Sequence, residues 1–307
     1  MDSANKQSAI VAEVTQGTTP GAPGFLLLRD NRVSGAPTRS INRSPERRPD
    51  RQMSNTYSGL TILNKSIEMA WARDAATDVL LASLFCGAYS TNVLKAASTK
   101  SFVTLEEKYE GGATDPYRRL TGCMVDSLSL SWRLGEPGSM TWSIMALAEA
   151  VATAAISGAT YAVPTPQYDP VTPTDVTVND LFSVSSPKLM SLNMTISNGM
   201  RPQHAFGSAS PFGIGLGQFD VRGSAQFYLQ AAADYSTFMS RQTGLILDLT
   251  IGSVASFRDR LVVGNCHVGN PDIDDPGAAG GDHMVTVEFI GAFLSADATA
   301  LKLTRLV

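Results

Sequence analysis

The chain has 307 residues and a formal net charge of −4, from 24 lysines and arginines against 28 aspartates and glutamates. This balance excludes a protein that binds nucleic acid through a strongly basic surface. Only 17% of the residues are charged, against about 25% in an ordinary soluble protein, so we expect subunit contacts to cover much of the surface, with a neutral surface rich in Ser, Thr and Gly as the alternative.

The N-terminal region and the cysteines indicate a protein that is made and kept in a cytoplasm. We expect no secretory signal, because residues 1–24 lack a basic segment followed by an apolar one. The Ala-rich segment 145–163 is interrupted by polar residues and predicts no transmembrane helix, hence no membrane partner. Cys86, Cys123 and Cys266 form no CxxC motif, which predicts neither a disulfide framework nor a zinc ribbon and fits a reducing compartment.

Alternation of apolar and polar residues predicts a mainly β protein. Apolar side chains at every second position place one face of a strand in the core. Residues 127–134 show this most clearly, since Leu128, Leu130, Trp132 and Leu134 alternate with polar residues. We expect strands, in chain order, at residues 25–28, 60–71, 102–109, 118–125, 127–134, 140–148, 192–196, 219–221, 245–251, 259–268 and 283–292.

Two segments depart from this period and predict short helices. Residues 74–85 begin with the capping residue Asp74, contain helix-forming alanines and an apolar stripe, and are followed by Gly87, which favours a helix end. Residues 234–241 begin with an aspartate and end in Arg241, whose charge suits the C-terminal end of a helix dipole.

The order of these elements predicts two similar halves in one chain. In each half a helix is followed by a strand, by an Arg-Leu segment containing Gly and Cys (RRLTGCMV and DRLVVGNCHV), and by a Met-led strand. Chance similarity between β-rich halves is the alternative. Closely spaced prolines mark a stiff connection between the halves. We therefore divide the chain into an N-terminal segment 1–24, a first half 25–160, a Pro-rich linker 161–187, a second half 188–295 and a C-terminal tail 296–307.

An Arg-rich loop occupies residues 29–59 of the first half. Between residues 29 and 51, seven arginines stand against three acidic residues, and prolines interrupt the segment. Such a segment buries little apolar surface, so we expect a long, mobile loop or arm. It is either a solvated loop or an arm that docks on an acidic neighbour through paired hydrogen bonds to carboxylates. The candidate contact residues are Arg39, Arg43, Arg47, Arg48 and Arg51.

No motif predicts a catalytic site, a cofactor or a metal. His267 cannot pair with Cys266, because neighbours on a strand point to opposite faces, and the other histidines are His204 and His283. The glycines of FGIGLGQF (residues 212–219) lack a following Gly-Lys-Ser/Thr and predict a flexible loop. A further cluster lacks the spacing of a calcium loop and favours a turn: Asp272, Asp274, Asp275 and Asp282. We expect no enzyme.

The assembled features resemble the major tail tube proteins of long-tailed bacteriophages. The resemblance covers most of the chain and depends on the order and spacing of its segments: FLLLRDNRVSGAPTRSINRSPERRPDRQMSNTYSGLTI, YRRLTGCMVDSLSLSW followed by GSMTWSIMALAEA, GQFDVRGSAQFYLQ, and RDRLVVGNCHVGNPDIDD with HMVTVEFIGAF. It implies a β-sandwich or barrel flanked by a short helix, here duplicated in one chain. It also implies rings that stack into a tube carrying DNA from the capsid to the host cell. We expect the Arg-rich arm to bridge successive rings of such a tube through Arg39, Arg43, Arg47, Arg48 and Arg51.

The resemblance further implies a structural virion protein of the phage tail, assembled in the host bacterial cytoplasm. Rings of this family are sixfold or pseudo-sixfold, so two tube folds per chain predict a homotrimeric ring, with a hexamer as the alternative. The implied partners are further copies of the chain, tail terminator and distal tail or baseplate proteins, the tape measure protein, and DNA bound without sequence specificity. An acidic balance suits a lumen in which DNA slides, since few cations replace the phosphate counterions.

Other classes of protein share this composition and the lack of an active site. A capsid decoration or tail terminator protein would cap or decorate without polymerising. A non-catalytic β-sandwich that binds a ligand would present exposed aromatic side chains. Aromatic residues make up only 7% of the chain, and we expect Trp71, Trp132 and Trp142 to face the core.

Overall fold

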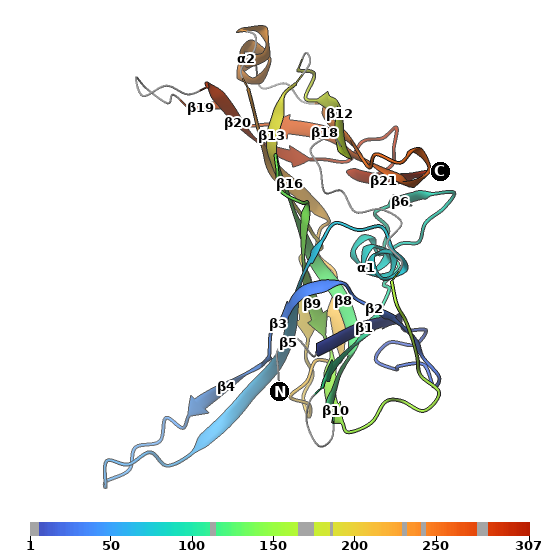
Figure 1. Ribbon diagram of the computed structural model, residues 1–307. Helices are drawn as coiled ribbons and strands as arrows, with labels where there is room; N and C mark the ends of the chain where they lie inside the picture. Colours follow the sequence, from blue (N-terminus) through green and yellow to red (C-terminus); the bar gives the residue numbers. More distant parts are fainter. Residues whose placement is uncertain are drawn as a thin grey trace.

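The computed structural model describes residues 6–110, 115–164, 175–184, 187–228, 232–240, 244–274 and 282–307. These residues form a mainly β protein, as expected from the alternating pattern. A long central sheet runs through the molecule, and two smaller sheets pack against the same side of it, one near each end (Figure 1). The sheets of this one chain are not closed into a barrel.

The central sheet is antiparallel and contains strands from both halves of the sequence. β8 and β13 lie next to each other at its middle and join the halves. Its strands, in spatial order, are β3 (Asp30–Ser34) with β4 (Pro37–Arg43), then β5 (Thr56–Ala70), β9 (Ser139–Ala146), β8 (Tyr117–Arg133), β13 (Leu189–Ser197), β16 (Asp220–Tyr228), β20 (Met284–Gly291) and β19 (Asp272–Asp274).

Each smaller sheet belongs mainly to one half of the sequence, and a short hairpin stands apart from all three sheets. The first small sheet has the order β11 (Thr160–Ala162), β2 (Gly24–Leu27), β1 (Lys6–Ala12), β7 (Val103–Tyr109), the start of β8, and β10 (Ala148–Ala152). The second has the order β12 (Val176–Leu181), β17 (Leu245–Ile251), β18 (Arg258–Val268), β21 (Leu301–Leu306) and β6 (Val93–Lys95). The hairpin consists of β14 (Arg201–Gln203) and β15 (Gly213–Gly215).

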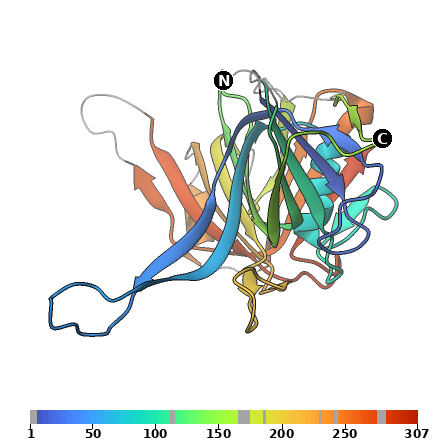
Figure 2. The ribbon, with the colours of Figure 1, turned by 90° about the horizontal axis from the view of Figure 1, so that it is seen from below.

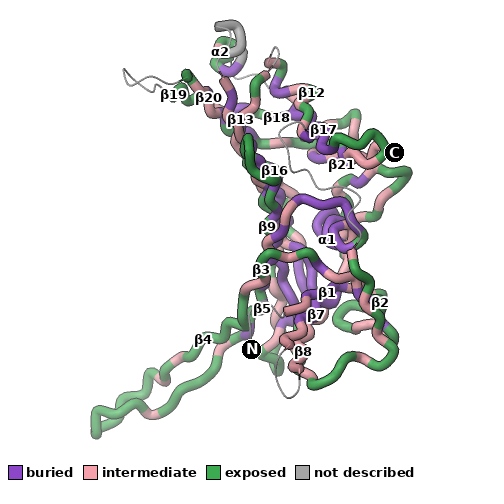
Figure 3. The backbone as a smooth tube through the Cα atoms, in the orientation of Figure 1, coloured by how far each residue is buried: buried purple, intermediate pink, exposed green. Residues whose placement is uncertain are grey.

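The helix α1 (Ala75–Phe85) confirms the first helix prediction, and it packs between β8, β1, β2 and β6. The Asp74 side chain caps it by accepting a hydrogen bond of 2.7 Å from the backbone N–H of Thr77. The left-handed residue at its end is Cys86 rather than Gly87. Most of α1 is buried, as its tube in Figure 3 shows, because it fills the first half between two sheets.

The second predicted helix is α2 (Ala232–Met239), which lies at the far end of the second half (Figure 1). Phe238 anchors it by packing against Phe227 of β16, with ring centroids 5.7 Å apart. Arg241, the expected C-terminal residue of this helix, lies outside the described residues. A short 3-10 helix (Ala255–Phe257) precedes β18.

The strand predictions are correct in their alternation, but four of them differ in detail. Residues 140–148 divide between β9, which ends at Ala146, and β10, which begins at Ala148. Residues 118–125 and 127–134 form the one strand β8, because a bulge lets it leave the small sheet and continue in the central sheet. Leu134 follows that strand and is exposed, unlike Leu128, Leu130 and Trp132. Phe219 precedes β16 and is only partly buried. The predicted burial of the three tryptophans is confirmed.

The two halves share one arrangement of strands. The set β1–β7–β8–β10 in the first small sheet matches β12–β17–β18–β21 in the second, and in the central sheet β5 and β9 match β16 and β20. β8 and β18 each carry a bulge just before a buried cysteine, where Gly122 (φ 62°) and Asn265 (φ 47°) have left-handed backbones. The register shifts identically in both bulges: Val103 faces Cys123 and Leu105 faces Leu120, while Leu245 faces Cys266 and Leu247 faces Val263.

One buried carboxylate lies among cations in the first half. Glu107 accepts hydrogen bonds of 2.7 Å from the Nζ atoms of both Lys6 and Lys65, and Arg118 Nη1 lies 3.5 Å from its Oε2. Burial alone raises the pKa of Glu107, but the hydrogen bonds from Lys6 and Lys65 outweigh it and hold that pKa below its usual value. Burial lowers the pKa of Lys65, whose side chain is 2% exposed. The cluster ties β1, β5, β7 and β8 together.

Candidate functional site

A β-hairpin projects from the first half of the molecule (Figure 2). We call residues 36–62 the arm. β4 pairs with the start of β5 from Pro37 opposite Leu63 to Arg43 opposite Thr56, so this part of the expected loop or arm is a strand hairpin. The ladder forms although little apolar surface is buried, because it pairs backbone groups locally. At the base of the arm, the backbone N–H of Thr61 donates a hydrogen bond of 2.9 Å to the Ala209 carbonyl.

The five candidate arginines are spread along the arm and are all exposed: Arg39, Arg43, Arg47, Arg48 and Arg51. Arg39 lies near the base, where its Nε donates a hydrogen bond of 3.2 Å to Thr61 Oγ1. Arg48 lies near the tip and pairs with Asp50 at 3.0 Å, and its hydrogen bonds lower the pKa of the Asp50 carboxyl. The structure therefore places these guanidinium groups along a hairpin rather than at one point.

The central sheet ends in two edges that pair with nothing else in the described part of the chain. β3 and β4 pair only with β5, and β19 pairs only with β20. Arg32 and Arg39 are exposed along the first edge, whereas Asp272 and Asp274 are exposed along the second. A free edge offers a row of backbone donors and acceptors to another strand. The opposite charges suit pairing of one edge with the other edge of a second copy.

The hairpin β14–β15 covers an apolar patch on the first half. Ile214 of this hairpin is fully buried against Met124, Met145 and Leu147. Lys100 Nζ donates a hydrogen bond of 2.5 Å to the Ile214 carbonyl. The expectation of a flexible loop at residues 212–219 is therefore wrong, because this segment packs on the neighbouring half.

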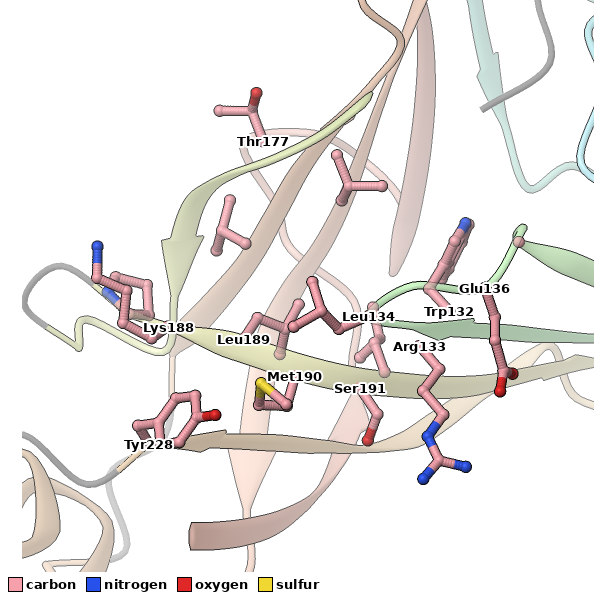
Figure 4. A pocket seen from close by; sticks show the side chains of 15 residues that line it. Trp132, Arg133, Leu134, Glu136, Thr177, Lys188, Leu189, Met190, Ser191 and Tyr228 are labelled. Carbon is pink, nitrogen blue, oxygen red and sulfur yellow. The ribbon is translucent and has the colours of Figure 1, made fainter. Parts of the chain in front are cut away.

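A pocket of about 610 Å³ opens where β12 faces the ends of β8 and β13 (Figure 4). Apolar side chains line much of it, among them Trp132, Leu189 and Met190. Glu136 and Lys188 lie on opposite sides of the pocket in this view. The lining residues include no histidine or cysteine, so the pocket offers no histidine-assisted nucleophile.

Those of the singled-out histidines and aspartates that the structure describes are not gathered into one site. His267 is exposed while Cys266 is buried, which confirms that these neighbours point to opposite faces. Over the described ranges, no group of three His, Cys, Asp or Glu side chains could hold a metal ion, and Asp275 lies outside those ranges. The three cysteines are free and buried, and burial raises the pKa of each thiol.

A buried aspartate at the start of β18 predicts that stability depends on pH. Asp259 is buried near Arg73, whose Nη1 lies 3.9 Å from its Oδ1, and near Tyr89 and Arg305. Burial raises the pKa of Asp259 to about 6, and the Arg73 charge only partly opposes this. The carboxyl of Asp259 therefore ionises at a lower pH in the unfolded chain than in the folded one. Its contribution to the free energy of unfolding is complete below pH ~4 and is lost as the pH rises to ~6.

We expect Asp259→Asn to gain stability relative to the wild type by up to about 3 kcal/mol between pH 4 and pH 7. Urea unfolding at several pH values measures the difference between the two free energies of unfolding. Asp272→Asn, at an exposed position, is the control and should parallel the wild type. If the difference in the free energy of unfolding between Asp259→Asn and the wild type did not change with pH, the expectation would be contradicted.

Comparisons with known proteins identify a family. No helix among the residues placed by the structure has the length and apolar character needed to span a membrane. A search of curated proteins finds no significant match. A family model described as phage tail tube protein matches residues 3–297, which is nearly the whole chain.

Proposed function

The chain belongs to the phage tail tube protein family, and we propose that three copies of it close into a ring with pseudo-sixfold symmetry. Membership of the family makes it a structural virion protein that self-assembles into the tail tube. In the proposed arrangement the rings stack, and the phage DNA passes through their lumen into the host cell. The proposed role requires no catalytic step.

The repeated strand arrangement supports a ring of three chains. Each chain supplies two similar units, and within the chain β13 of the second unit adds to β8 of the first. The matching contact between chains would join β3 and β4 of one copy to β19 of the next. Three chains then supply six units, and closure leaves no exposed edge in the central sheet.

The other proposed partners follow from a place in the tail. The ends of the tube meet tail terminator and distal tail or baseplate proteins, and the lumen holds the tape measure protein and then DNA. The net charge of −4 supports a lumen that binds DNA without sequence specificity, since few cations would hold the phosphates. Assembly takes place in the host bacterial cytoplasm.

Electron microscopy of the purified chain over a concentration series tests the proposed function. Hollow tubes or stacked rings are the expected result, and the observation behind it is the family match over residues 3–297. A monomer that never polymerises, even with tail initiator proteins present, would contradict it. A chain that only decorates or caps preformed particles would favour a decoration or terminator protein.

We predict that each ring contains three chains of 32.6 kDa. Native mass spectrometry of rings released from tubes measures this number directly. Image reconstruction provides an independent count, because two alternating kinds of unit distinguish a pseudo-sixfold ring from a sixfold one. A ring of six chains would contradict the prediction while leaving the tube assignment intact.

A further inference from the structure

The two halves differ at one pair of equivalent positions on the sheet. In the first half Met124 lies opposite Met145, and the hairpin β14–β15 buries both. In the second half the matching pair, just after the second bulge, is His267 opposite Ile290. Both are exposed, and Ile290 is 52% exposed. Phe293, 64% exposed, follows on the same chain segment. We call His267, Ile290 and Phe293 the open patch.

The arm occupies the position in the first half that β14–β15 occupies in the second. The hairpin β14–β15 connects β13 to β16. In the same way the arm connects β3 to the later part of β5, which pairs with β9 in the central sheet. Pro37 opposite Leu63 matches Ile196 opposite Val221 in the pairing of these strands. The arm extends away from its own molecule, so it covers no such patch in its own chain (Figures 1 and 2).

The arm carries unburied apolar side chains of its own. Ile41 is 77% exposed, and Leu60 and Ile62 are also exposed. Ile41 lies four residues after Pro37, just as Met200 lies four residues after Ile196, and Met200 packs against the cluster around Met124 and Met145. Apolar groups exposed on both surfaces are the groups that a contact would bury.

We propose that the arm of one chain docks on the open patch of the next chain in the ring, as β14–β15 docks on the first half within a chain. The occupant is a second copy of this chain, and the inference rests on the ring arrangement proposed above. Charge adds to the match, because Glu288 is exposed two residues before Ile290 on the same strand face. The base of the arm brings Arg39 toward that carboxylate.

Two lysines in the open patch should prevent ring closure. The double variant Ile290→Lys/Phe293→Lys places cations where the Arg-rich arm must dock and removes the apolar contact, so we expect at least a tenfold loss of rings. The urea midpoint of the monomer should stay near that of the wild type, because both side chains are exposed. Val254→Lys, an exposed position of the second half outside the patch, is the matched control.

Cross-linking tests the contact directly. The variant Ile41→Cys/Ile290→Cys, treated with a short bismaleimide after assembly, should give covalent dimers and trimers, and Ile41→Cys alone should not. The native cysteines are buried and should stay unmodified. Rings that form normally without cross-links, or with both lysines present, would overturn this inference and leave the tube function standing. A wild-type chain that forms neither rings nor tubes would overturn both.

Discussion

Reversing the charge of Arg43, Arg47 and Arg48 is expected to leave rings intact and to stop them from stacking into tubes. These side chains are exposed along the outer part of the arm, beyond the base that we assign to contacts within the ring. An arm that extends past its own sheet can reach a neighbouring ring, where its guanidinium groups would pair with carboxylates. We therefore expect the base of the arm to act within a ring and its tip to act between rings.

The size of the effect follows from repetition around the ring. A single exposed ion pair contributes about 0.2–1 kcal/mol. Charge reversal turns several such attractions per chain into repulsions. Every chain of a ring makes the same contacts with the next ring, so the free energy of stacking one ring on another falls by about 3–5 kcal/mol. We expect the concentration needed for elongation to rise at least about a hundredfold.

Sedimentation and electron microscopy of the triple variant Arg43→Glu/Arg47→Glu/Arg48→Glu measure this prediction. Lys95→Glu/Arg133→Glu, at exposed positions outside the arm and the open patch, is the matched control and should elongate normally. High salt should also weaken stacking of the wild type, because exposed charges are screened. Normal tubes from the triple variant would refute an inter-ring role for the arm tip.

Replacing Glu107 by alanine is expected to destabilise the monomer by about 3–5 kcal/mol. The carboxylate is fully buried and holds Lys6 and Lys65 at 2.7 Å each. Its removal leaves the nearly buried Lys65 ammonium without its partner, and an unpaired buried charge costs more than the pair contributes. Urea unfolding of the purified variant measures the loss.

The equivalent half of the molecule supplies the control for this variant. By the matching registers, Leu249 of β17 occupies the place of Glu107 in β7, so the fold accepts an apolar residue there. The double variant Lys65→Met/Glu107→Leu removes both charges and should recover most of the stability lost in Glu107→Ala. Equal instability of the double and single variants would show that the loss comes from packing rather than from an unpaired charge.

Local signals in the sequence predicted the elements that depend on local chemistry. The Asp74 cap and apolar stripe were sufficient for α1, and period-two alternation identified the buried face of β8 and β17. The same signals failed where pairing or packing with another segment decides the structure. The arm forms strands because β4 finds a partner in β5, and FGIGLGQF is ordered because Ile214 is buried on the other half.

The candidate site was predictable only in part. The excess of arginine marked the arm, and the structure shows those residues exposed along a hairpin. The open patch was missed, because an exposed isoleucine on an amphipathic strand carries no signal of its own. One signal could have found it. Aligning the two similar segments, RRLTGCMV and DRLVVGNCHV, places Met124 opposite His267, and an apolar residue matched by a polar one indicates that a buried position corresponds to an exposed one.

The strand β8 has a consequence for how the chain folds during synthesis. Its end, Ser127–Arg133, finds a partner in β13, whose residues are synthesised some sixty residues later. Until Leu189–Ser197 has left the ribosome, the first half has an unpaired edge in the middle of what becomes the central sheet. Such late, long-range pairing slows folding and exposes an edge to aggregation. The first half should therefore gain protection from proteolysis only after the second half has begun to emerge.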